Sequence, residues 1–227
     1  LLAKKQEELT EFRKAFMNSV YFSVLCLFPL FTFCFINSEK IFLLLFTEKW
    51  LSAAVVFQAF CIMFPFIILG IPQKNIIVLS NHAKWWFQLQ VKLSLIIVPL
   101  TAISASWGLN SLLIALIFGK YLYCAVSMWK SCQLLALNIK EYIANFIVPL
   151  ICCFVAAITT TLITQLILPS KFLMVDIIIS ATIFFITYLA QLLLFDRKKL
   201  VTIGLILFPN NNQLNKLAKK LNIQDPQ

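Results

Sequence analysis

Three lysines lie inside long apolar stretches of this 227-residue chain: Lys74, Lys92 and Lys120. A lysine at the centre of a membrane helix costs about 2.5–3.5 kcal/mol on insertion scales, so an ammonium retained there is a functional candidate. In a water-filled cavity it would act as a point charge suited to a phosphate or diphosphate group. The alternative for Lys74 and Lys92 is that their long side chains reach the membrane surface.

Lys120 is the strongest candidate of the three. It lies ten residues after Asn110, near the expected start of its helix, and therefore about 15 Å along the helix axis, close to mid-membrane. Gly119 beside it would allow another helix to approach closely. The alternatives are that a neighbouring helix satisfies Lys120 or that the lysine tilts towards lipid headgroups.

Gln88 is the fourth candidate, because Gln88 and Lys92 are four residues apart and share one face of a helix. The two side chains could line a polar lumen together with the other lysines. The alternative is that they form hydrogen bonds between helices, which is the more common use of such residues.

Other chemistry is sparse in this chain. Asp176 is the available carboxylate inside an apolar stretch, which makes it a candidate for ion coupling. His82 is the single histidine and has no metal-ligand neighbour. The seven cysteines fall in apolar runs without a CxxC pair, which favours packing over metal binding or disulfides. We expect no enzyme activity, no metal site and no cofactor.

The composition excludes most soluble proteins. Hydrophobic residues make up 61% and charged residues 12% of the chain, against about 45–50% and about 25% in an ordinary soluble domain. Intrinsic disorder is excluded too, because it requires low hydrophobicity. The net charge of +10 is spread between apolar blocks, so it points to membrane topology and lipid headgroups as partners rather than to nucleic acid.

The apolar runs predict an all-α polytopic bundle, because runs of about 20 residues cross a membrane as helices, whereas barrel strands are about half as long. Short connections predict that the second and third, third and fourth, and fifth and sixth helices are antiparallel hairpins. The run 41–46 is too short to cross. The expected spans are 15–36, 53–79, 85–105, 110–135, 142–168 and 172–195.

Two charged segments flank the six spans. Residues 1–14 are predicted to form a cytoplasmic amphipathic lead-in, and residues 196–227 a basic cytoplasmic tail. Within the tail, residues 213–223 form either an interfacial helix or a solvated segment. With both termini in the cytoplasm, most basic residues outside the spans lie inside, and only Lys40, Lys49 and Lys171 lie outside.

Aromatic and proline residues agree with this topology. Trp50 and Trp107 would lie at the outer membrane surface, whereas Trp85, Trp86 and Trp129 would lie at the inner one. Four prolines interrupt the spans and tend to kink helices, which favours a protein that moves between conformations; they are Pro29, Pro65, Pro99 and Pro149.

The order of features resembles a known family. The segment Leu45-Phe46-Thr47-Glu48-Lys49-Trp50-Leu51-Ser52-Ala53-Ala54 resembles the F-G-x-x-W/Y-x-x-A element of polysaccharide flippases. A charged stretch at 6–16 precedes it, and a polar patch at 73–82, a turn at 107–110 and the segment 139–142 follow it. Over residues 1–195 the chain is similar to the C-terminal part of an O-antigen flippase of the multidrug, oligosaccharidyl-lipid and polysaccharide exporter superfamily. It departs at Thr47 and Asn110, where the family usually has Gly, and in its Lys-rich tail.

This resemblance implies a fold of two helical lobes that open alternately to either side, of which six spans would be one partial lobe. It implies translocation of undecaprenyl-diphosphate-linked oligosaccharide across the bacterial inner membrane, beside other polysaccharide-assembly membrane proteins. Lys120 and Lys92 would meet the diphosphate. The start at Leu1 suggests a C-terminal fragment.

Three alternatives stay open. One is a multidrug or small-solute exporter of the same superfamily, which would use Asp176 for ion coupling. Another is a non-transporting membrane fragment or partner-binding subunit. A membrane enzyme of envelope synthesis is the third, although it would need clustered Arg, His or carboxylates on large outside loops.

Overall fold

The computed structural model describes residues 2–167 and 173–207, and within these ranges the chain is helical and contains no strand. This confirms the all-α prediction. The elements are α1 (Leu2–Ile36), α2 (Ser38–Leu45), the short 3-10 helix η1 (Glu48–Ala53), α3 (Ala54–Leu79), α4 (Ala83–Ala105), α5 (Leu109–Leu134), α6 (Ile139–Ile167), α7 (Leu173–Phe195) and α8 (Arg197–Leu207).

Six of these helices are long and apolar enough to cross a membrane, which confirms the predicted polytopic bundle. They are α1, α3 with η1, and α4 to α7. Helix α1 has 35 residues and is therefore about 52 Å long, more than a hydrocarbon core of about 30 Å requires. It continues without a break across residue 14, so the predicted lead-in and first span are one helix.

Two elements appear where the sequence analysis predicted none. Residues 41–45 of the short apolar run form most of α2, and the Phe42 ring packs against Phe46 and Phe57 at centroid distances of 5.3 and 5.5 Å. Helix α8 follows α7 after the single residue Asp196. The predicted helix at 213–223 lies outside the described residues.

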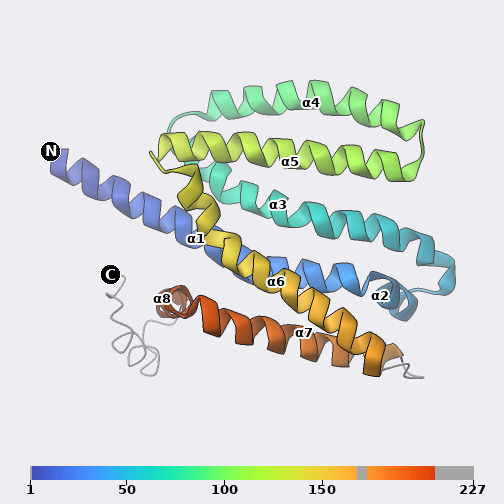
Figure 1. Cartoon of the computed structure of the whole chain (residues 1–227). Helices are drawn as coiled ribbons and strands as arrows, with labels where there is room; N and C mark the ends of the chain where they lie inside the picture. Colours follow the sequence, from blue (N-terminus) through green and yellow to red (C-terminus); the bar gives the residue numbers. More distant parts are fainter. Residues whose placement is uncertain (1, 168–172, 208–227) are drawn as a thin grey trace.

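The helices pack in an order that differs from their order in the chain (Figure 1). Helix α4 packs on α5, α5 on α3, α3 on α1, α1 on α6 and α6 on α7. The turn after α3, with Asn81 at a φ of 63°, reverses the chain as expected. The prediction that α3 and α4 pack as a hairpin is nevertheless largely wrong, because α5 lies between them and runs parallel to α3.

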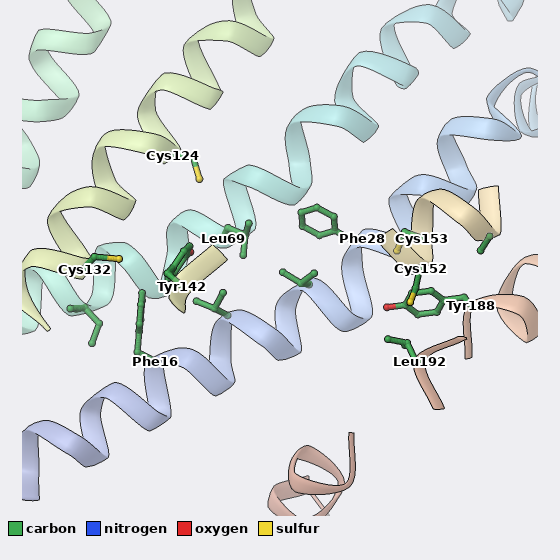
Figure 2. Packing of buried hydrophobic residues seen from close by; sticks show 14 of the residues in the cluster. Phe16, Phe28, Leu69, Cys124, Cys132, Tyr142, Cys152, Cys153, Tyr188 and Leu192 are labelled. Carbon is green, nitrogen blue, oxygen red and sulfur yellow. The ribbon is translucent and has the colours of Figure 1, made fainter. Parts of the chain in front are cut away.

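The hydrophobic core lies where α1, α3, α5, α6 and α7 meet (Figure 2). Phe16, Val20, Val24 and Phe28 recur every four residues and form a buried stripe along α1. Cys124, Cys132, Cys152 and Cys153 belong to the same cluster, which confirms the packing role predicted for them. None of the described residues of this cluster comes from α4, so α4 is a peripheral helix.

Candidate functional site

Lys74 of α3 and Lys120 of α5 line the same surface hollow. This hollow has a volume of about 190 Å³, and α4 completes it with Gln90. A second hollow of about 430 Å³ adjoins it and shares Gln90, Lys120 and Tyr123. We call the two hollows together the lysine groove. Two lysines that are 46 positions apart in the sequence are therefore brought to one site by the packing of α3 on α5.

A buried glutamine fixes the level at which α3 crosses α5. Gln73 is fully buried, and its Nε2 donates a hydrogen bond of 2.9 Å to the Tyr142 hydroxyl of α6. The Ser127 hydroxyl of α5 donates to Oε1 of the same glutamine. Successive residues of a helix point about 100° apart, so locking Gln73 inward leaves Lys74 on the groove side.

Gly119 lets α4 approach α5 on the same side. A Cβ atom at this position would lie 2.9 Å from Cδ1 of Ile97, which is closer than side chains tolerate. The predicted close approach at Gly119 is thus confirmed, and the partner is α4. This contact brings Gln90 to Tyr123, with 3.5 Å between Nε2 and the hydroxyl oxygen.

Trp86 helps to hold α4 on α5. It packs edge-on against Tyr123 at a centroid distance of 5.2 Å and is buried. Next to it, Trp85 contacts α5 as well, because the Lys130 ammonium lies 5.5 Å from the Trp85 ring centroid.

The lysine groove is electropositive. Its described lining contains no Asp or Glu, and both lysine side chains are exposed. Neither ammonium has a hydrogen-bond or ion-pair partner among residues 9–166 and 173–205. Two cations that face one hollow repel each other, and a bound anion would relieve that repulsion. The arrangement is therefore suited to a ligand with more than one negative charge.

The other predicted site residues lie elsewhere. Gln88 and Lys92 are exposed on α4 but do not line the groove, whereas Gln90 does. Gln90 is not among the site residues predicted from the sequence, although it follows Trp86 by one turn and so shares its face. Asp176 is half-buried in the first turn of α7, and α7 begins at the opposite end of the bundle from the end of α3 (Figure 1). The ion-coupling candidate is thus separate from the groove.

A second polar cluster joins α1, α6 and α8. The Tyr21 hydroxyl donates a hydrogen bond of 2.8 Å to Oδ2 of Asp196, and both residues are buried. The Lys199 ammonium lies 5.2 Å from the Tyr21 ring centroid and donates to the Asn145 carbonyl oxygen at 3.2 Å. Each of these groups has a protein partner, so the cluster serves to fasten helices.

In the described part of the chain, no group of three His, Cys, Asp or Glu residues could hold a metal ion. No protein-family model, curated protein or solved structure matches this sequence. The function of the chain must therefore be inferred from the lysine groove and the membrane-spanning bundle that carries it.

Proposed function

We propose that this chain takes part in moving undecaprenyl-diphosphate-linked oligosaccharide across the bacterial inner membrane, as part of a polysaccharide flippase. The observation that supports this most directly is the meeting of Lys74 and Lys120 in one groove on a polytopic bundle. A diphosphate carries charge on both phosphates, and two lysines on separate helices can contact both.

The depth of the groove supports the same function. Lys120 lies about 16 Å along α5 from Leu109, and Lys74 about 7 Å before the end of α3 at Leu79. Keeping Lys120 at that depth costs about 2.5–3.5 kcal/mol unless it faces water or an anion. A cation pair that reaches from near one membrane surface to mid-membrane would lower the barrier for a diphosphate that enters the bilayer.

The proposal includes a topology and a larger assembly. Both termini lie in the cytoplasm, and the six helices form one partial lobe of an exporter fold whose other lobe faces the lysine groove. Covering the groove in this way would convert it from a lipid-facing hollow into a water-filled cavity, which the exposed lysines require. The partners are the lipid-linked substrate, membrane lipids and other polysaccharide-assembly membrane proteins.

A translocation assay tests this function. The full chain is reconstituted in phosphatidylcholine vesicles together with the other polysaccharide-assembly membrane proteins and a fluorescent undecaprenyl-diphosphate oligosaccharide, and vesicles without the chain serve as the blank. A reductant that cannot cross the membrane reports the fraction of the lipid exposed outside. We expect protein-dependent translocation that falls by about tenfold or more in the Lys74→Ala/Lys120→Ala variant.

Lys92→Ala is the matched control, because Lys92 is an exposed lysine of α4 outside the groove. Its rate is expected to stay within about twofold of the unmodified chain. The proposal is wrong if vesicles with the chain translocate the lipid no faster than vesicles without it, or if the double variant works as fast as the unmodified protein.

A further inference from the structure

We propose that the outer face of α4 holds the hydrocarbon tail of the lipid whose diphosphate occupies the lysine groove. The identity of that lipid rests on the proposed function. The site itself is a third hollow of about 540 Å³ on the surface of α4. In this arrangement the tail lies on the lipid side of α4, and the charged head lies on the side that packs against α5.

The third hollow is continuous with the lysine groove. Gln90, Ser94 and Val98 line both the third hollow and the larger part of the groove. These residues follow one another at intervals of four on α4, so they form a single edge of the helix. A molecule that crosses this edge has its polar head in the lysine groove and its apolar part on the outer face of α4.

The remainder of the third hollow is apolar and open. Phe87, Val91, Leu95 and Pro99 form its other walls. Phe87 is 65% exposed and Leu95 is 70% exposed, so no described part of the chain covers them. Because α4 contributes none of the described residues of the core cluster, this face is free to take a lipid tail without loss of core packing.

The two lysines of the groove favour a lipid with a diphosphate head over an ordinary phospholipid. An ordinary phospholipid carries its negative charge on one phosphodiester, whereas the groove presents both Lys74 and Lys120. A lipid diphosphate satisfies both cations with one head.

Photolabelling tests the position of the tail. The full chain in phosphatidylcholine nanodiscs is irradiated with a polyprenyl diphosphate that carries a diazirine on its tail, and the adducts are mapped by peptide mass spectrometry. We expect adducts within residues 87–99 that fall about fivefold or more with excess undecaprenyl diphosphate but not with the same excess of phosphatidylglycerol. Adducts spread evenly over α6 and α7, or equal competition by phosphatidylglycerol, would overturn the inference.

A pair of tryptophan variants provides a second readout. Leu95→Trp fills the third hollow from an exposed position, whereas Ile114→Trp changes an equally exposed residue of α5 outside all three hollows. We expect Leu95→Trp to weaken the binding of undecaprenyl diphosphate about fivefold and to leave geranyl diphosphate unchanged. Equal effects of the two tryptophans, or equal effects on the two ligands, would contradict a tail site on α4.

The translocation assay in vesicles, made with the same purified chain, separates this inference from the proposed function. Competed adducts on α4 without translocation would leave the tail site standing and overturn the flippase. Translocation together with competed adducts outside α4 would support the flippase and overturn the tail site.

Discussion

The Tyr21 hydroxyl donates a hydrogen bond of 2.8 Å to the Asp196 carboxylate and so ties α1 to the residue between α7 and α8. The two residues are 175 positions apart, and both are buried. A hydrogen bond to a carboxylate in a buried site is stronger than one to a neutral acceptor. This contact therefore fastens the middle of α1 to the junction of α7 and α8.

Removing that hydroxyl tests its contribution. Tyr21→Phe leaves the Asp196 carboxylate buried without its donor, and we expect the free energy of unfolding to fall by about 1–2 kcal/mol. The measurement is reversible unfolding in mixed micelles followed by circular dichroism. Tyr121→Phe is the control, because Tyr121 is 39% exposed and its ring contact with Phe66 survives. Equal stability of the two variants would show that the Tyr21–Asp196 bond does not fasten the helices.

The buried amide of Gln73 gives a second prediction. Gln73→Leu removes the hydrogen-bond donor of the buried Tyr142 hydroxyl and leaves the Ser127 hydroxyl only its bond to the Cys124 carbonyl oxygen, so we expect a loss of about 1–3 kcal/mol in the same unfolding measurement. Gln88→Leu alters an exposed glutamine of α4 and should change stability by less than about 0.5 kcal/mol. Equal stability of Gln73→Leu and Gln88→Leu would show that the hydrogen bonds of Gln73 to Ser127 and Tyr142 do not fix the position of α3 along α5.

The contact between Gly119 and Ile97 gives a third prediction. Gly119→Val places a branched side chain where a Cβ alone would lie 2.9 Å from Ile97, and we expect about 1–3 kcal/mol of destabilisation. Gly70→Ala is the matched glycine control, since no atom lies within 4 Å of its added Cβ, and it should be neutral or slightly stabilising.

A compensating change checks the reason for that loss. Ile97→Ala should restore much of the stability lost in Gly119→Val, because it removes the atoms that clash. Failure of this rescue would indicate that the glycine matters for a reason other than the approach of α4 to α5.

The pair of lysines gives a fourth prediction, measured by the binding of geranyl diphosphate to the chain in nanodiscs. Lys74→Ala and Lys120→Ala should each weaken binding by about 5- to 20-fold, because each removes one charge from the same ligand. Their effects should not be additive, since both contact one diphosphate. Additive effects would place the two lysines at separate sites, and a loss with Lys92→Ala would mean that binding is not confined to the groove.

Hydropathy alone was sufficient to predict the spans. The span predicted at 110–135 is observed as α5 (Leu109–Leu134), and the span predicted at 172–195 is observed as α7 (Leu173–Phe195). A long apolar run in lipid forms an α-helix, because the backbone must satisfy its own hydrogen bonds there. The elements α2 and α8 were missed as helices, since short segments depend on what packs against them.

The sequence by itself determined that the chain is a bundle of six long apolar helices and that a few cations and amides lie within them, because length and polarity are local properties. Only the tertiary structure decided that α5 inserts between α3 and α4, since many packing orders satisfy the same hydropathy. This packing order places Lys74 and Lys120 in one hollow, which Gln90, rather than Gln88, also lines. Which face of a nearly uniform apolar helix is covered depends on small residues such as Gly119 and on buried pairs such as Gln73 and Tyr142, whose partners lie far away in the chain.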